Sequence, residues 1–270
     1  MLTPAALAGL GWIAAAAVMA ALWALQRRTR NAAVADAGWS ALVGGLAVFY
    51  ATQAHGMPGR RLAIASMMGS WGARLTVYLL YDRVLGKPED GRYAALRRTH
   101  PNADKWFFRI FQLQGAAAVL FSAPALVASV NPAPDFDVLE FAGAALWIVG
   151  FAGETTADRQ LLHFKMDKDN AGRTCRTGLW RYSRHPNYFF EWIIWVAYAL
   201  FAAASPLGWM TFVCPALMLY LLLRITGIPP AEAQALRSRG DDYLRYQEAT
   251  SAFVPWRPRR TRDAALVRSE

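Results

Sequence analysis

The sequence predicts an all-α protein, a polytopic membrane helical bundle with seven transmembrane helices. Of its 270 residues, 55% are hydrophobic and only 18% are charged. The apolar residues stand in long blocks that reach the length of a bilayer-spanning helix. An ordinary soluble protein of this size would carry more charge and shorter apolar runs. The alternative is a water-soluble helical protein with unusually buried helices.

Each apolar block is long enough to cross a bilayer or nearly so. The first, PAALAGLGWIAAAAVMAALWAL, holds no charged residue, and the basic run RRTR follows it. Because no basic segment precedes this block and no small-residue cleavage pattern stands out, we expect a retained span rather than a cleaved signal peptide. The predicted spans are 4–25, 38–54, 61–81, 108–130, 137–157, 188–204 and 206–227.

The basic residues predict the orientation of these spans. With residues 27–30 on the cytoplasmic side, the amino terminus is outside and the carboxyl terminus is cytoplasmic. Of the 29 lysines and arginines, only Arg60 and Arg61 then fall in an outside connection, in agreement with the positive-inside rule. We expect one membrane-embedded domain, 1–270, with cytoplasmic loops 82–107 and 158–187, a short helix near 92–98 and a tail, 228–270.

The net charge of +10 follows from this topology. Basic residues gather in cytoplasmic loops, where they face anionic lipid, so nucleic-acid binding is not indicated. Cys175 and Cys214 show neither pairing nor metal-site spacing. We therefore expect no disulfide framework, no metal centre and no nucleic-acid partner.

Ionisable residues interrupt the cytoplasmic halves of several spans. Each could reach the headgroups or form a structural pair, but together they favour a polar pocket, because charge in hydrocarbon is costly. Glu154 and Asp158 are four residues apart, as are Asn187 and Glu191, so each pair shares a helix face. The ionisable residues are Arg74, Glu154, Asp158, Glu191 and Arg224.

The stretch GLWRYSRHPNYFFEW leads into the sixth predicted span. Pro186 suits the first turn of that helix, whose free amide groups then face the cytoplasm. A nearby basic cluster favours a phosphate or carboxylate ligand, although it could also anchor the helix at lipid headgroups. No GxGxxG or phosphate-loop motif occurs, so a nucleotide would be held by the bundle and its loops. The cluster is Arg173, Arg176, Arg181, Arg184 and His185.

These residues resemble the steroid 5-alpha-reductase family. The resemblance rests on GLWRYSRHPNY with an acidic residue four positions beyond the asparagine, on TTADRQL, on RITG and on DDYLRYQEATSAFVPW. It runs from about Leu146 to Trp256 and is closest to bacterial members. The wider superfamily also contains sterol reductases and isoprenylcysteine carboxyl methyltransferases.

The resemblance implies an NADPH-dependent oxidoreductase acting on CH–CH groups. Its substrate would be a hydrophobic enone such as a 3-oxo-4-ene steroid, reduced to the 5-alpha product. The implied location is a bacterial inner membrane, with the cofactor site facing the cytoplasm and no obligate protein partner. The implied cofactor-binding residues are Arg74, Glu154, Asp158, Lys165, Arg173, Tyr182, His185, Asn187, Glu191, Arg224, Tyr243 and Tyr246.

The catalytic positions depart from the family pattern. Animal members hold the substrate ketone with a glutamate on the second span and a tyrosine on the third. In this chain the corresponding positions are Gln53 and Trp71, with Tyr78 as a substitute for the tyrosine. Such groups would stabilise a developing enolate by hydrogen bonding. The family often has asparagine where this chain has Glu154.

Two alternatives remain open. The RHPxY element is shared with the methyltransferase branch of the superfamily. The first alternative function is therefore that of an S-adenosylmethionine-dependent membrane methyltransferase. The several arginines suit a pyrophosphate and a 2'-phosphate and thus favour NADPH, since S-adenosylmethionine carries no phosphate. A non-enzymatic membrane scaffold or lipid-binding protein would not need Asn187, Glu191 and Asp158 beneath a basic shell.

Overall fold

The computed structural model describes residues 2–259, apart from the side chain of Arg92. No β-strand occurs in that range, where one isolated bridge pairs Ser183 with Ser251. The all-α prediction is confirmed. The chain divides into two compact units. Among the described residues, unit 1 comprises 2–144 and 198–214, and unit 2 comprises 145–197 and 215–259.

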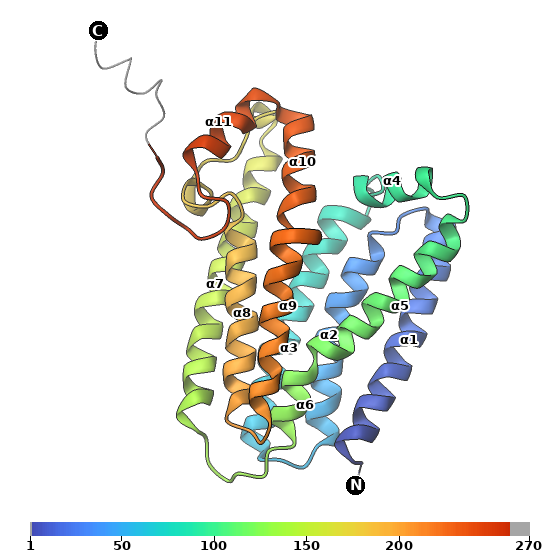
Figure 1. Cartoon of the computed structure of the whole chain (residues 1–270), viewed down its shortest axis with the longest axis vertical. Helices are drawn as coiled ribbons and strands as arrows, with labels where there is room; N and C mark the ends of the chain where they lie inside the picture. Colours follow the sequence, from blue (N-terminus) through green and yellow to red (C-terminus); the bar gives the residue numbers. More distant parts are fainter. Residues whose placement is uncertain (1, 260–270) are drawn as a thin grey trace. The chain divides into compact units, whose positions relative to one another are not determined.

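Unit 1 is built around a helical hairpin. α2 and α3 pack against each other, α1 packs on α5, and α6 contacts both hairpin helices (Figure 1). The close approach of α2 and α3 depends on Gly72, where a Cβ would lie only 2.8 Å from the Ser40 carbonyl oxygen. The elements are α1 (Pro4–Thr29), α2 (Val34–Gln53), α3 (Pro58–Leu79), a π-helical turn (Leu80–Val84), α4 (Gly91–Thr99), α5 (Ala103–Phe121), α6 (Ala123–Ser129) and a 3-10 helix (Gly208–Phe212).

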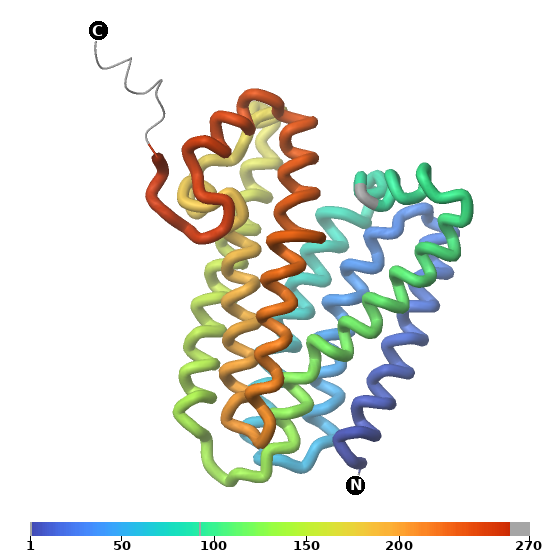
Figure 2. Tube along the Cα trace, viewed as in Figure 1, coloured from blue at the N-terminus to red at the C-terminus, as the bar shows by residue number. Residues whose placement is uncertain are grey.

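Unit 2 contains most of α7, most of α8, and a helical rod that runs from the end of α9 into α10. α11 contacts α10, and the chain after α11 returns to the loop that precedes α8, as the trace in Figure 2 shows. The elements are α7 (Val138–Met166), 3-10 helices (Lys168–Asn170 and Gly178–Arg181), α8 (Pro186–Ala203), α9 (Val213–Tyr220), a π-helical turn (Leu221–Ile225), α10 (Ile228–Arg239) and α11 (Asp241–Ala249).

Within residues 2–259, five helices are long and apolar enough to cross a membrane. α1 shows the expected surface, because it exposes large apolar side chains such as Trp12 and Ile13. The protein therefore has the character of a membrane protein. The five segments are Pro4–Thr29, Val34–Gln53, Ala103–Ser129, Val138–Met166 and Gly208–Arg239.

The two other predicted spans coincide with α3 and α8, which are helical but are not among these five segments. Arg60, Arg61 and Arg74 lower the hydropathy of α3, and Asn187 and Glu191 lower that of α8.

Two predicted loops contain more helix than the sequence indicated. The short helix expected near 92–98 is confirmed as α4. The loop predicted from residue 158 is still helical as far as Met166, because α7 continues beyond its apolar part. The tail folds into α10 and α11.

Arg60 lies in a helix and not in the connection between two spans where the sequence predicted it. It lies in the first turn of α3, with only 1% of its side chain exposed, and forms an ion pair with the fully buried Glu140. Its Nη1 and Nη2 groups also donate to the carbonyl oxygens of Ala133 and Asp135. The arginine thus joins α3, the loop before α7 and α7 itself.

Candidate functional site

A polar pair joins α7 and α8 where α8 begins. Asn187 donates from Nδ2 to Oδ1 of Asp158 over 3.2 Å, and Asp158 is only 5% exposed. The amide oxygen of Asn187 is also buried, and no partner for it occurs among the described residues. A buried acceptor without a donor loses free energy, so this oxygen is suited to a ligand that supplies a hydrogen.

Two glycines let the helices approach closely enough to form this pair. A Cβ at Gly150 would lie 3.1 Å from the Ile194 backbone nitrogen, and one at Gly153 would lie 2.3 Å from the Phe190 ring. Both glycines precede Asp158 on α7. The sequence therefore brings the two backbones together through small residues and places the Asp158 and Asn187 side chains beyond the contact.

Further carboxylates flank the pair. Glu154 lies one turn before Asp158 on the same face of α7 and is 2% exposed. Glu191 lies one turn after Asn187 on α8 and is half-buried. These four side chains form the candidate site within unit 2, and their polar atoms can accept and donate hydrogen bonds to a polyhydroxylated or amide-bearing ligand.

The loop before α8 is fixed to α7. Trp180 donates from Nε1 to the Ala157 carbonyl over 2.9 Å, and the Leu179 amide donates to Oε1 of Gln160 over 2.9 Å. Gly178 has a φ of +57°, a left-handed conformation that glycine adopts without steric cost. These contacts hold the entry to α8 beside Asp158.

A second network, here called the cap, links this loop to α10 and α11. Arg184 pairs with Glu232 over 2.7 Å and donates to the carbonyl oxygens of Gln247 and Thr250 at 3.0 and 2.7 Å. The last two contacts satisfy carbonyl groups at the end of α11, which lack partners within the helix. The predicted basic cluster is therefore partly structural.

Three predicted cofactor residues belong to the cap. His185 contacts Glu232 over 3.3 Å and stacks on Tyr188, with ring centroids 5.3 Å apart. Tyr243 also donates to Glu232, and Tyr246 donates to the carbonyl oxygens of Trp180 and Ser183. Burial raises the pKa of both tyrosines. The structure thus gives these residues protein partners.

One family model matches most of the chain. The family model described as "Protein of unknown function (DUF1295)" matches residues 22–250. The chain belongs to the DUF1295 family. It is also similar to "Uncharacterized protein C594.04c" of the fission yeast Schizosaccharomyces pombe, at 27% identity over 223 residues. The aligned part is 71% of this chain and 64% of that relative, so the chain spans less than two thirds of the relative's length. No solved structure matches significantly.

The DUF1295 match includes every candidate site residue, but these residues do not all gather in one unit. Asp158, Asn187, Glu154 and Glu191 lie together in unit 2. Other predicted cofactor residues of unit 2 lie at its surface, where they remain accessible to phosphate groups. The surface residues are Lys165, Arg173, Tyr182 and Arg224.

Unit 1 of the DUF1295 chain holds Arg74 and the predicted carbonyl-binding residues. Trp71 is fully buried and meets Trp39 edge-on, with centroids 5.8 Å apart. Tyr78 lies two turns further along α3 and is half-buried. Gln53 is exposed at the far end of α2.

The structure does not bring Gln53 together with Trp71 or Tyr78. Gly72, beside Trp71, touches α2 at the level of Ser40 and Gly44. Gln53 follows Gly44 by nine residues, which is about 14 Å along a helix. The prediction that these side chains hold one carbonyl jointly is therefore not supported, because the register of the hairpin could not be read from the sequence.

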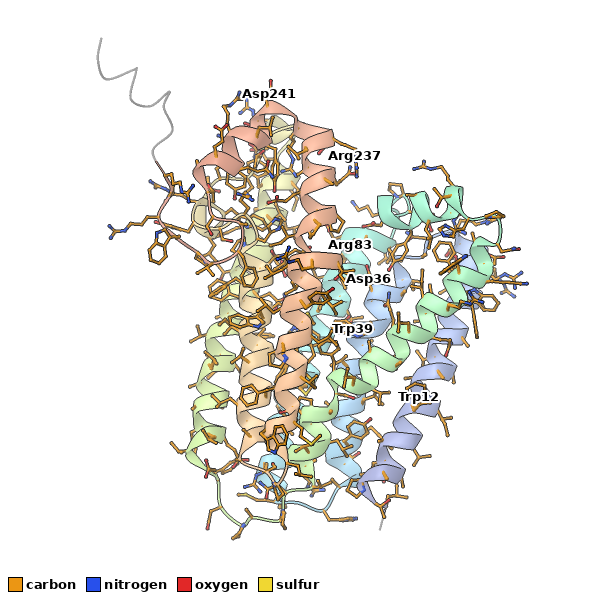
Figure 3. The ribbon with its side chains drawn as sticks, in the orientation of Figure 1. Trp12, Asp36, Trp39, Arg83, Arg237 and Asp241 are labelled. Atoms are coloured by element: carbon orange, nitrogen blue, oxygen red, sulfur yellow. The ribbon has the colours of Figure 1, made fainter. Side chains whose placement is uncertain are left out.

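A polar cluster at the start of α2 was not predicted from the sequence. Asp36 accepts a hydrogen bond from the Tyr93 hydroxyl at 2.7 Å and pairs with Arg83 at 3.4 Å. Figure 3 labels Asp36 and Arg83, together with Trp39 one turn further along α2. Gln114 donates to the Tyr93 hydroxyl at 3.3 Å. An acidic residue at the start of an apolar run was the signal that could have identified this cluster.

His185 is expected to make the stability of the DUF1295 chain depend on pH. Burial holds the pKa of this ring below its usual value, although Glu232 favours the protonated form. Because the unfolded ring titrates near pH 6.5, the unfolded state binds more protons just below that pH, and stability falls on acidification. Thermal unfolding in detergent should show a lower midpoint at pH 5.5 than at pH 7.5, with a smaller difference in His185→Gln.

His55→Gln is the matched control, since His55 is exposed in the turn after α2. It should keep the full pH dependence. Identical pH profiles for His185→Gln and His55→Gln would contradict the assignment.

Proposed function

We propose that this DUF1295 protein is a membrane-embedded, NADPH-dependent oxidoreductase that reduces the carbon–carbon double bond of an enone lipid. A 3-oxo-4-ene steroid converted to its 5-alpha product is the model reaction. The proposal includes seven spans, an outside amino terminus and a cofactor site that faces the cytoplasm of a bacterium. The observation that carries it is the buried amide oxygen of Asn187, next to Asp158, for which residues 2–259 provide no hydrogen-bond donor.

The residues present fit a dinucleotide. The Asn187 oxygen accepts a hydrogen bond, and both ribose hydroxyls and a carboxamide supply one. Asp158 adds acceptors on the same side, and Glu154 and Glu191 extend the polar surface by one turn on each helix. Exposed Arg173 and Arg224 offer guanidinium groups for phosphates.

When bound, NADPH supplies the hydride that the beta carbon of the enone accepts. The residues of this chain bind and orient the cofactor and the substrate, and they exclude water from the site. In this scheme Asn187 and Asp158 orient the nicotinamide-ribose end of the cofactor. A hydrogen bond donated to the substrate carbonyl stabilises the enolate that hydride transfer produces. The alpha carbon then takes a proton from water or a tyrosine.

The second candidate is an S-adenosylmethionine-dependent methyltransferase. One structural observation favours it: two arginines of the basic cluster already pair within the protein. Arg176 pairs with Asp242 at 2.7 Å and Arg184 with Glu232 at 2.7 Å. Fewer cations therefore remain for phosphates than the sequence indicated, which suits a cofactor without phosphate.

Ligand binding to the detergent-purified full chain separates the two candidates. NADPH should raise the unfolding temperature of the wild type. Asn187→Ala, which removes a hydrogen-bonding partner, and Arg173→Ala, which removes a phosphate contact, should each weaken binding about tenfold, equivalent to roughly 1.4 kcal/mol. Turnover of progesterone with NADPH would then be measured.

Arg237→Ala is the control, because Arg237 is an exposed arginine of α10 whose guanidinium group hydrogen-bonds Gln234 on the same helix. It should leave NADPH binding unchanged. Stabilisation by S-adenosylmethionine without stabilisation by NADPH would establish the methyltransferase candidate instead.

A further inference from the structure

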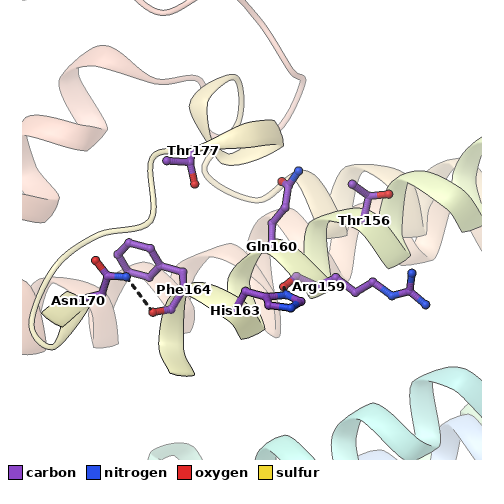
Figure 4. Close-up of a pocket in the computed structure, with 7 residues that line it drawn as sticks. All are labelled: Thr156, Arg159, Gln160, His163, Phe164, Asn170 and Thr177. Carbon is purple, nitrogen blue, oxygen red and sulfur yellow. Dashed lines mark hydrogen bonds between the residues drawn. The ribbon is translucent and has the colours of Figure 1, made fainter. Parts of the chain in front are cut away.

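A groove of about 640 Å³ lies beside the last turns of α7. Figure 4 shows its lining side chains on the helix and on the loop that follows it. The groove lies wholly within unit 2. It is lined by Thr156, Arg159, Gln160, His163, Phe164, Asn170 and Thr177.

This groove is separate from the candidate site. Thr156 precedes Asp158 by two residues, and two residues turn an α-helix by about 200°. The groove therefore lies on the face of α7 opposite Glu154 and Asp158. It is not accounted for by the proposed cofactor.

The groove continues an exposed stripe of α7. Side chains at steps of four, four, three and four residues face outward along one side of the helix, which is the spacing of a helical face. The first part of the stripe is apolar, and Ile148 is 62% exposed. The second part is polar. The stripe consists of Ile148, Ala152, Thr156, Arg159 and His163.

The length of α7 explains the change of polarity. Its 29 residues span about 43 Å, whereas the hydrocarbon core of a bilayer is about 30 Å thick. One end must therefore extend into the headgroup region. The apolar side chains of the stripe are suited to contact with acyl chains. The groove lies further along the helix, where α7 would pass from the hydrocarbon core into the headgroup region.

The groove has the donors that a phosphate needs. No ion pair of Arg159 occurs among the described residues, and its guanidinium group can donate two parallel hydrogen bonds. His163 lies one turn after Arg159 on the same face of α7 and donates from Nδ1 to the Arg159 carbonyl over 2.8 Å, which fixes its ring beside the guanidinium-bearing residue. Thr156 and Thr177 add exposed hydroxyl groups.

The helix dipole does not oppose this site strongly. An anion is disfavoured near the carboxyl end of a helix, but the effect falls off within the last turn. Thr156 and Arg159 precede the end of α7 at Met166 by about two turns or more. Asn170 also satisfies the Phe164 carbonyl with a hydrogen bond of 3.2 Å, drawn in Figure 4.

We infer that this groove binds the phosphate of an anionic phospholipid, with the acyl chains along Ile148 and Ala152. The positive charge of Arg159 complements the lipid phosphate. The apolar part of the stripe lies on the same face of α7 and can contact the acyl chains of the same lipid. A soluble phosphate ester would use the groove alone and would gain nothing from the stripe. The lipid is thus the occupant that uses both parts.

Titration with short-chain lipids tests this inference on the detergent-purified full chain. Dioctanoyl phosphatidylglycerol should raise the unfolding temperature of the wild type more than dioctanoyl phosphatidylcholine does, and inorganic phosphate should not raise it. Arg159→Gln should increase the half-saturating lipid concentration roughly fivefold, equivalent to about 1 kcal/mol for one cation near anionic lipid. Arg159→Gln/His163→Gln should abolish the preference for phosphatidylglycerol.

Arg237→Gln is the matched control, since it removes the same charge from an exposed position on α10. It should keep the lipid preference. An unchanged preference in the double variant would overturn the inference. Equal stabilisation by inorganic phosphate would also overturn it, because the occupant would then be a soluble anion.

Discussion

Replacing Glu140 with alanine is expected to lower the free energy of unfolding by about 3–5 kcal/mol, the usual result of breaking a buried ion pair. Glu140 is fully buried and accepts from Nε and Nη2 of Arg60. It also accepts from the Asp137 amide at 2.8 Å. Without the carboxylate, the Arg60 charge stays buried with backbone carbonyls and the Phe136 ring as its partners among the described residues, and no anion. Unfolding of the full chain in mixed micelles would measure the loss.

The loop before α7 contains a matched control. Asp135 is exposed, and only its carbonyl oxygen, not its carboxylate, contacts Arg60. Asp135→Ala removes a carboxylate from the same region and should change stability by less than about 0.5 kcal/mol. Arg60→Met/Glu140→Leu should lose less than the two single variants added together, because the pair is coupled. Equal stability of Glu140→Ala and Asp135→Ala would rule out a stabilising pair.

This ion pair shows what sequence reasoning could not supply. The sequence placed Arg60 in a connection because it stands between two apolar blocks, and block length predicts helices well. Its partner is eighty residues away, and no local pattern shows such a contact. The same limit applies to Glu232, whose side chain contacts Arg184, His185 and Gln247, because no local pattern marks it as a partner of these residues.

Part of the candidate site could be predicted from the sequence, namely Asp158 and Asn187, but the separate roles of the basic residues could not. Asp158 and Asn187 could be chosen because ionisable and amide groups at the ends of apolar runs are costly and need partners. The structure does join these two residues. Spacing alone could not separate basic residues that face solvent, such as Arg173, from basic residues that face the cap, such as Arg184. That distinction depends on where α10 and α11 fold back.

Replacing Glu232, the central carboxylate of the cap, is the second substitution expected to lower stability strongly. Glu232 accepts hydrogen bonds from Arg184 at 2.7 Å, from Gln247 at 2.8 Å and from Tyr243 at 3.4 Å. Glu232→Ala is expected to lower the free energy of unfolding by about 1.5–3 kcal/mol, as for hydrogen bonds to charged groups. Arg184 would remain mostly buried without its carboxylate. Hydrogen exchange should become faster across residues 241–256, which the cap holds against the loop before α8.

Glu248→Ala is the control for this prediction, because Glu248 is exposed on α11 and its side chain has no hydrogen bond in the described structure. It should leave exchange in the cap unchanged. Faster exchange in both variants alike would show that α11 is loosened by any substitution there and not through Glu232.

The cap also has a consequence for the proposed site. Ser183 bonds the Phe253 carbonyl at 2.7 Å, and the Arg184 amide bonds the Ser251 carbonyl at 2.8 Å. These contacts fix the chain just before Pro186, where α8 begins. If Asn187 binds the cofactor, Glu232→Ala should weaken NADPH binding although Glu232 never touches the ligand. Weaker binding together with faster exchange, and neither change in Glu248→Ala, would identify Glu232 as a positioning residue that orders the entry to α8.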